Sequence, residues 1–311
     1  MAEPHRIDVH HHPTPVLGLL GGRVSGSPGI NEWTAAVSLS DMDKNGVATA
    51  VLSMPNRVNV WRSVDQARGR AMARQWNEFM ARQASDHPGR FGFFAAVPIL
   101  DIEGSILEAA HALDHLGADG VTLMTNMGDK WLGDPHYFPL FEELDRRKAV
   151  IYTHPISADC MQNMLTPDID DSVIEFTADT SRAIARMLFS GAAHRFPNIR
   201  FIFSHAGGTM PFILERYTRH AQSDAALAAR VPDGVLAYLK RFYYDTAQAS
   251  HPSAMASITQ FVAISQFLFG TDFPFRNAED HVAGLAACGF SAAELFAIEC
   301  GNARRLLPHR A

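Results

Sequence analysis

Eight short, largely apolar runs alternate with helix-like stretches along the chain, and this alternation restricts the fold more than any other feature. Runs that are apolar throughout are typical of parallel strands buried on both faces. The runs are Arg6–Val9, Val47–Ser53, Phe91–Pro98, Gly120–Thr125, Ala149–Thr153, Ile199–Ser204, Phe242–Asp245 and Ile264–Gly270. The main helix-like stretches are Val64–Gln83, Gly104–Leu116, Tyr137–Arg147, Thr177–Arg195 and Pro211–His220. The pattern predicts an α/β fold, a (β/α)8 TIM barrel, with a doubly wound open sheet as the alternative.

No low-complexity linker divides the chain, so we expect residues 1–311 to form one domain. Barrels often reach this length. Two stretches are too long for ordinary turns between a strand and a helix: Pro13–Thr34, which is rich in Gly and Pro, and Ser157–Ser172. Because loops of this length usually carry function, we expect both to be insertions at the C-terminal face of the barrel.

Charge and composition exclude several classes of partner. The formal net charge of −6 argues against nucleic acid or an anionic membrane as a partner. No apolar run reaches the roughly 18 residues needed to span a bilayer. The three cysteines, Cys160, Cys288 and Cys300, are odd in number and widely spaced, which favours a reducing compartment. No apolar signal segment precedes the first strand, so we expect a cytoplasmic protein.

The first apolar run leads into His10-His11-His12. Side chains at positions i and i+2 of a strand share a face, so His10 and His12 can enter one cavity while His11 points toward the helices or solvent. Two imidazoles on one face supply half of a nitrogen-rich metal site. The alternative is a chance cluster, because the chain has 15 histidines.

Three more polar side chains follow the ends of predicted strands: His154 in the fifth, His205 in the sixth and Asp272 in the last. In a barrel the carboxyl ends of the strands converge on one mouth, where catalytic residues gather. A single histidine at such a place is more often structural, but four metal-competent positions on four strands are difficult to assign to packing. A closed structural zinc site would favour cysteine ligands. The combination therefore predicts a catalytic metal site.

These motifs resemble those of the amidohydrolase superfamily, and most closely the aminocarboxymuconate-semialdehyde decarboxylase-like family, which includes γ-resorcylate and 5-carboxyvanillate decarboxylases. The matching segments are Ile7–His12, Thr153–Pro155, Phe203–Gly208, Tyr244–Thr246, Gly270–Pro274 and Gly301–Ala303. The resemblance implies four metal ligands, His10, His12, His154 and Asp272. It places His205 near the metal-bound water rather than on the metal.

The resemblance also implies how many metal ions are bound. Binuclear members of the superfamily carry a carboxylated lysine at the end of the fourth strand. Here that strand is Gly120–Thr125, and the nearest lysine, Lys130, lies in the following loop. We therefore expect one divalent metal ion, Zn²⁺ in the first place and Mn²⁺ as the alternative.

The activity implied by the resemblance is a metal-dependent, non-oxidative decarboxylation. The expected substrate is a small aromatic or unsaturated carboxylic acid of the hydroxybenzoate kind, with Asp272 as proton donor and His205 as an acid or base. The same site could instead serve a lactone or amide hydrolase or a hydratase. A binding protein with a structural metal is the third possibility.

Arginines are the candidate partners of the substrate carboxylate. Arg216 follows His205 by eleven residues (216 − 205), the offset at which these decarboxylases carry an arginine that reaches the neighbouring subunit's active site. This implies a homodimer or homotetramer, while the alternative is a solvated arginine on a helix. Arg57 and Arg276 are weaker candidates. The arginine that muconate decarboxylases carry before their first helix is missing from Trp33–Asp41, which argues against a dicarboxylate semialdehyde.

Apolar residues near the predicted mouth could line a pocket for an aromatic ring, although packing is the simpler interpretation of each. The candidates are Trp131, Phe275, Met127, Phe273 and the segment Leu17–Leu20. Asp245 and Thr246, at the end of the seventh strand, either orient a ligand or tie a loop.

Overall fold

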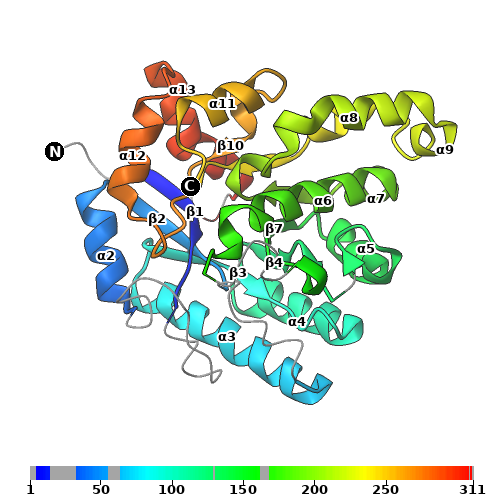
Figure 1. Cartoon of the computed structure of the whole chain (residues 1–311). Helices are drawn as coiled ribbons and strands as arrows, with labels where there is room; N and C mark the ends of the chain where they lie inside the picture. The colour runs from blue at the N-terminus through cyan, green and yellow to red at the C-terminus, as the bar shows by residue number, and fades with distance from the viewer. Residues whose placement is uncertain are drawn as a thin grey trace.

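The computed structural model is a barrel of parallel strands with helices around it (Figure 1), and it describes residues 5–14, 33–54, 64–128, 130–161, 168–307 and 309. The main sheet has eight strands in the order β1-β2-β3-β4-β7-β8-β9-β10. All of these pairs are parallel. The strands are Arg6–His11 (β1), Val47–Leu52 (β2), Phe91–Ala96 (β3), Gly120–Met124 (β4), Val150–His154 (β7), Arg200–Phe203 (β8), Tyr243–Asp245 (β9) and Phe267–Leu268 (β10).

Backbone hydrogen bonds join the segment after β10 to β1 and close the barrel. The Val9 N–H donates to the Phe269 carbonyl at 2.9 Å, and the His12 N–H donates to the Phe273 carbonyl at 2.8 Å. The Asp272 N–H donates in turn to the His10 carbonyl at 2.9 Å. The predicted (β/α)8 barrel is confirmed, and the open sheet is excluded.

Helices fill the connections and cover the outside of the barrel (Figure 1). The longer ones are Ala35–Lys44 (α2), Gln66–Asp86 (α3), Ile102–His115 (α4), Phe138–Arg146 (α5), Glu175–Phe189 (α6), Met210–Ser223 (α8), Pro252–Thr259 (α11) and Ala278–Ala286 (α12). The shorter ones are Ala192–Arg195 (α7), Ala225–Ala228 (α9), Val235–Leu239 (α10), Ala292–Phe296 (α13) and Asn302–Leu306 (α14). Across the described parts of the chain, no helix combines the length and apolar character that crossing a membrane requires.

Two sequence-based boundaries are wrong. The helix predicted over Thr177–Arg195 is divided into α6 and α7, because Gly191 between them has a φ of 82°, which ends a helix. The last strand, predicted over Ile264–Gly270, begins with a 3₁₀ turn at Ile264–Gln266. It also ends early, because the Phe269 N–H donates to the carbonyl of Ile298 rather than to β9.

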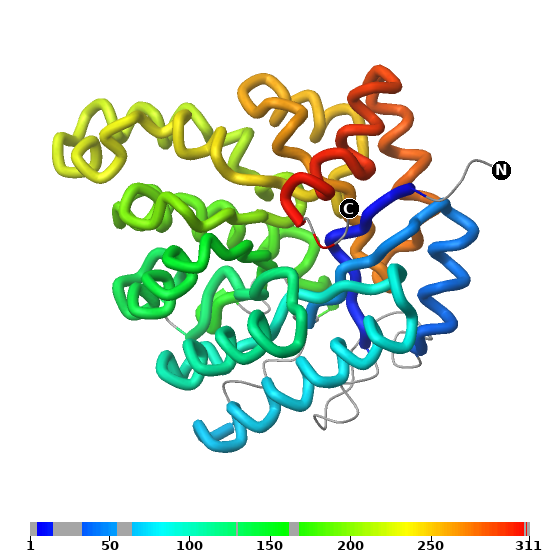
Figure 2. Tube along the Cα trace, turned by 180° about the vertical axis from the view of Figure 1, so that it is seen from behind, coloured from blue at the N-terminus to red at the C-terminus, as the bar shows by residue number. Residues whose placement is uncertain are grey.

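Apolar side chains form two layers. One cluster fills the space between the strands and the surrounding helices. The other lies inside the barrel, where the rings of Phe94 and Tyr152 stack 5.2 Å apart. The C-terminal helix α14 contributes Ala303 and Leu306 to this interior cluster and lies beside the first strand (Figure 2). It covers the end of the barrel opposite the mouth, which leaves the carboxyl ends of the strands for the site.

Candidate metal centre

A break in the alternation of β1 turns two histidines into the barrel. Val9 belongs to the interior cluster, so strict alternation would point His10 outward. The register of β1 against β2 shifts between Asp8 and His11, and at this point the His10 N–H donates to Oδ1 of Asp8 at 3.0 Å. Such a bulge re-aims the side chains that follow it. His10 consequently faces the interior, with its ring 5.4 Å from that of Tyr152.

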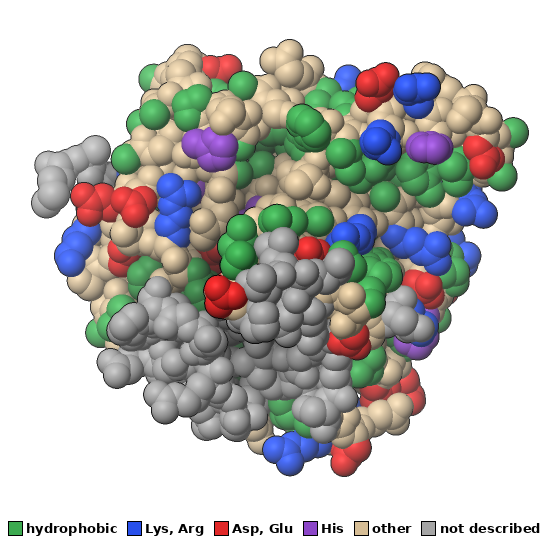
Figure 3. All heavy atoms as spheres, in the orientation of Figure 1, with side chains coloured by type: hydrophobic (Ala, Val, Ile, Leu, Met, Phe, Trp, Pro, Cys, Tyr) green, Lys and Arg blue, Asp and Glu red, His purple; other side chains and the backbone are tan. Residues whose placement is uncertain are grey.

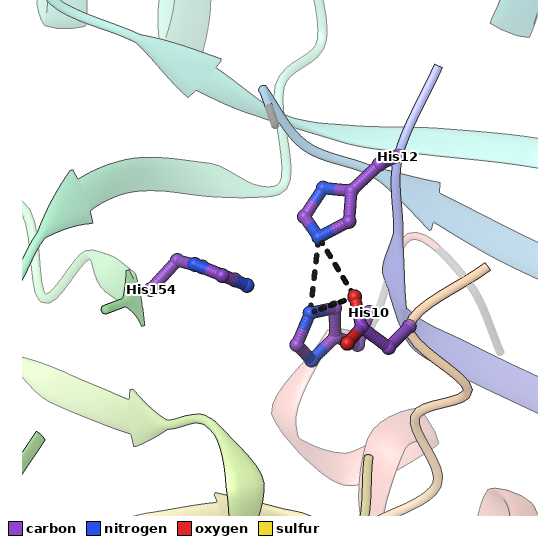
Figure 4. Close-up of side chains that lie close together, drawn as sticks. His10, His12 and His154 are labelled. Atoms are coloured by element: carbon purple, nitrogen blue, oxygen red, sulfur yellow. Dashed lines mark hydrogen bonds and ion pairs between the residues drawn. The ribbon is translucent and has the colours of Figure 1, made fainter. Parts of the chain in front are cut away.

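Four side chains converge at the mouth of the barrel. His10, His12, His154 and Asp272 are buried, and each offers one ligand atom within 4.8 Å of the others. Figure 4 shows the three imidazoles pointing toward one another. The Nε2 atoms of His10 and His12 are 3.0 Å apart, and Oδ1 of Asp272 lies 3.2 Å and 3.4 Å from them. Tetrahedral ligands of one zinc ion lie roughly 3.3 Å apart, so this spacing fits a single ion.

Hydrogen bonds fix the orientation of each imidazole. The Nδ1 atoms contact Oδ2 of Asp245 at 2.9 Å (His10), the carbonyl of Ser53 at 3.1 Å (His12) and the carbonyl of Pro155 at 2.9 Å (His154). Carboxylates and carbonyls only accept, so each Nδ1 carries a hydrogen and each Nε2 presents a lone pair when the imidazole is neutral. Nε2 of His154 is buried and has no hydrogen-bond partner among the described residues. Three lone pairs that converge beside a carboxylate fit a divalent cation.

The electrostatics of the protein alone favour positive charge on His10 and disfavour it on His154. Burial lowers the pKa of His10, but the carboxylates of Asp245 and Asp272 outweigh burial and raise this pKa to about 10. Burial, followed by the neighbouring imidazoles, holds the pKa of His154 well below its usual value. Burial raises the pKa of Asp272, but His10 and the other imidazoles outweigh it and hold the pKa well below the usual range.

His205 lies beside the four-residue cluster without joining it. Its Nε2 is 3.6 Å from Oδ2 of Asp272, the oxygen that does not face His10 and His12. Its backbone N–H donates to Oδ1 of Asp245 at 2.9 Å, so one carboxylate orients both His10 and His205. Neither ring nitrogen of His205 has a hydrogen-bond partner in the described part of the chain. The side chain can therefore exchange a proton with Asp272 or with a ligand.

His11 points away from the site, as expected from its position in the strand. Its Nδ1 contacts Oδ2 of Asp8 at 3.0 Å, and its Nε2 contacts the hydroxyl of Ser38 in α2 at 2.7 Å. The ring of Phe273 stacks on it at 4.6 Å. Phe273 therefore packs behind β1, and its suggested place in the substrate pocket is wrong.

The other residues predicted to bind the substrate lie in different places. Phe275 lies at the site, with its ring 5.8 Å from that of His12. Arg276 donates to the Asp280 carbonyl at 3.3 Å, which ties its loop to α12. Arg216 is exposed on α8 and has no hydrogen bond or ion pair with the described residues of its own chain. Arg57 and Leu17–Leu20 lie outside the described residues.

Asp245 and Thr246 have different roles. Asp245 orients His10 and His205 as described above. The Thr246 hydroxyl contacts the Leu268 carbonyl at 3.3 Å and Nε2 of His281 at 3.0 Å. Thr246 therefore ties β9 to β10 and α12 rather than orienting the metal cluster.

Sequence reasoning missed two residues. Asp179 on α6 is buried and accepts hydrogen bonds from Thr125, from Asn126 and, at 2.6 Å, from the indole N–H of Trp131. It thereby holds the hairpin of β5 (Asn126–Met127) and β6 (Lys130–Trp131), in which Met127 is buried. Gln248, in the loop after β9, donates from Nε2 to Oδ2 of Asp272 at 2.9 Å. Neither residue belongs to a motif, and only the folded chain brings them to their partners.

The sequence model of the amidohydrolase family matches residues 7–309. The chain belongs to the amidohydrolase family. This amidohydrolase is 34% identical over 286 residues to decarboxylase yanB of Aspergillus niger, a match that covers 87% of the chain and 77% of the relative. It is 31% identical over 276 residues to 6-methylsalicylic acid decarboxylase of Penicillium expansum, a match that covers 86% of the chain and 85% of the relative. The family predicted from the motifs is confirmed.

The fold of this amidohydrolase is also found among solved structures. One is a dihydroxybenzoic acid decarboxylase of a Polaromonas species, solved with bound manganese and the inhibitor 2-nitroresorcinol. The TM-score is 0.83 at 22% sequence identity, and the match covers 99% of this chain and 98% of the other. At this identity the similarity establishes a common barrel fold.

Proposed function

We propose that this amidohydrolase is a metal-dependent decarboxylase that releases CO₂ from an aromatic carboxylic acid of the hydroxybenzoate kind. The observation that carries the proposal is that the two carboxylate oxygens of Asp272 face different groups. Its Oδ1 faces the Nε2 atoms of His10 and His12, while its Oδ2 lies beside His205. One carboxylate can thus hold a metal ion and still present an oxygen that moves a proton. The relatives above 30% identity, which are named decarboxylases, support the same reaction class.

The ligand set supports one divalent ion held by His10, His12, His154 and Asp272. Three imidazole nitrogens favour Zn²⁺, whereas manganese in the Polaromonas structure makes Mn²⁺ the alternative to test. When bound, such an ion polarises the carboxylate and the neighbouring hydroxyl oxygen of the acid.

The protein's own groups then move one proton. Asp272 is ionised in the resting site, so it first takes a proton at Oδ2 from His205 and then donates it to the ring carbon that bears the carboxylate. The bond between that carbon and the carboxylate then breaks, and its electrons restore the aromatic ring as CO₂ leaves. His205, 3.6 Å from Oδ2, serves as the acid or base that exchanges the proton with Asp272. We propose Phe275 and Trp131 as walls of the ring pocket and Arg57 as a partner of the substrate carboxylate.

A CO₂-release assay over hydroxybenzoates, with 6-methylsalicylate and 2,6-dihydroxybenzoate included, tests the reaction. We expect about one Zn²⁺ or Mn²⁺ per chain by metal analysis, and loss of both metal and activity in His10→Ala and Asp272→Ala. Full metal occupancy in both variants would contradict the ligand assignment. Opening of lactones without CO₂ release from any acid would replace the decarboxylase with the hydrolase alternative.

We further propose that the protein is a homodimer in which Arg216 serves the neighbouring active site. Hydrophobic and basic side chains lie together on the face that carries α8 (Figure 3). On that helix Phe212, one turn before Arg216, is 90% exposed, which is unusual for an aromatic side chain. Light scattering should give twice the mass of the chain, and Arg216→Ala should raise KM while the mass stays unchanged. A monomer with full activity would contradict this proposal.

A further inference from the structure

Gln248 has a backbone conformation that its side chain makes costly. It lies three residues after the end of β9, as the third residue of a turn in which the Ala249 N–H donates to the Thr246 carbonyl at 3.1 Å. Its φ is 54°, in the left-handed region that glycine adopts freely and a residue with a side chain adopts at a cost. Such conformations persist where the surrounding structure enforces them, and they concentrate at functional sites.

The Gln248 side chain makes a hydrogen bond that glycine could not make. Its Nε2 donates to Oδ2 of Asp272 at 2.9 Å. Gln248 is exposed, so its amide reaches the buried carboxylate from the solvent side. The contact joins the loop after β9 to the segment after β10, directly at the metal centre.

The contact makes the two oxygens of Asp272 different. A carboxylate turns readily about its last side-chain bond, so it could present either oxygen, or both, to the three imidazoles. With Oδ2 held by Gln248, only Oδ1 is directed at Nε2 of His10 and His12. Oδ2 remains beside His205, where the proposed proton transfer takes place.

We infer that Gln248 is a positioning residue that holds Asp272 in the orientation with one oxygen toward the metal ion and the other toward His205. Asp245, the last residue of β9, performs the corresponding task for His10, and its Oδ1 also accepts from the Ala247 N–H in the loop that follows, at 3.0 Å. The end of β9 and the loop after it therefore set the geometry of two proposed metal ligands. The metal-binding part of this inference needs only the metal site, whereas the catalytic part rests on the proposed function.

Two substitutions of Gln248 test the inference, and Lys148 supplies a matched control. Gln248→Gly removes both the amide and the backbone cost, and Gln248→Asn shortens the side chain by one methylene. Lys148 is exposed, has a φ of 53° and is the last residue of a turn in which its N–H donates to the Asp145 carbonyl at 2.9 Å. It precedes β7, at the end of the barrel opposite the site, so Lys148→Gly relieves the same conformation without touching the metal centre.

The first readout is metal affinity, measured on the full-length protein by competition between Mn²⁺ binding and a chelator, with free Mn²⁺ followed by EPR. Partners that orient metal ligands typically contribute about 10- to 100-fold to affinity. We expect the Mn²⁺ dissociation constant to rise within that range in Gln248→Gly and Gln248→Asn, and to stay at the wild-type value in Lys148→Gly. Both glycine variants should keep or raise the melting temperature, which separates positioning from a loss of folding.

The second readout is the division between kcat and KM at saturating metal. We expect kcat to fall about tenfold or more, with KM changed less than twofold, in both Gln248 variants. Wild-type Mn²⁺ affinity together with wild-type kcat in both variants would overturn it. If no acid is decarboxylated by the wild-type protein, the proposed function fails, while the Mn²⁺ affinities still decide the role of Gln248 in holding Asp272.

Discussion

Oδ2 of Asp245 accepts a hydrogen bond from Nδ1 of His10 at 2.9 Å, and both side chains are fully buried. The other oxygen of Asp245 accepts from the backbone N–H of His205. Asparagine has a single acceptor oxygen, so it cannot serve both partners. We expect Asp245→Asn to raise the Mn²⁺ dissociation constant about 10- to 100-fold. Competition with a chelator measures this dissociation constant. The control is Thr246→Ser, which changes the neighbouring residue without touching the metal cluster. Equal affinities in the two variants would contradict the orienting role.

Metal binding should depend on pH because the ion competes with a proton on His10. In the metal-free protein Asp245 and Asp272 raise the pKa of His10 to about 10, so this imidazole is protonated at neutral pH. It must lose that proton before Nε2 can bind a metal ion. We therefore expect the affinity to rise about tenfold per pH unit between pH 6 and 9. Calorimetry in buffers of different ionisation enthalpy should detect release of about one proton at pH 7, and its absence would show that His10 is already neutral.

His281 should make folding stability depend on pH. Burial lowers its pKa to about 4 in the folded protein, against 6.5 for an ordinary histidine. Between these values the unfolded chain binds a proton that the folded chain excludes, so the free energy of unfolding falls as the pH falls. This residue alone should change the free energy of unfolding by about 1.4 kcal/mol per pH unit, or by about 3 kcal/mol over the whole interval between the two pKa values. As the pH is lowered from 7 to 4, the urea midpoint of the wild-type protein should fall more steeply than that of His281→Phe, and parallel curves for the two proteins would contradict this.

Asp179 should control both stability and the placement of Trp131. Asp179→Ala removes the acceptor of the buried Thr125 hydroxyl and of the half-buried Trp131 indole N–H, at about 1–3 kcal/mol for a group that water does not reach, while the Asn126 amide still donates to the Ile156 carbonyl. We expect a lower melting temperature and, if Trp131 lines the substrate pocket, a higher KM. Trp131→Phe removes the indole donor and leaves a smaller ring, and it should cost about 1 kcal/mol for the lost hydrogen bond. A raised KM with an unchanged melting temperature in Asp179→Ala would contradict the structural role.

The strands and the metal cluster could be predicted because each depends on short-range sequence patterns. Apolar runs identify buried parallel strands, and polar residues that follow those runs identify the barrel mouth. His10, His12, His154, His205 and Asp272 could therefore be grouped from the sequence, and the resemblance to the family selected the four metal ligands among them. The ends of the strands and helices were predicted less well than the elements themselves. The ends of β10 and α6 depend on where the Phe269 N–H finds its acceptor and on the conformation of Gly191, and neither depends on local apolar pattern.

The orientation of side chains within the site was decided by tertiary contacts alone. The spacing of His10 and His12 shows that they share a face, but their direction into the barrel depends on the register shift where Asp8 accepts the His10 N–H. A bulge inverts which residues face inward, and it leaves no mark in the apolar pattern. Gln248 is the clearest case, because its contact with Asp272 joins positions 24 residues apart through the closure of the barrel. The sequence by itself determined the barrel and the four clustered side chains, while only the folded chain decided which atom of each side chain faces the centre.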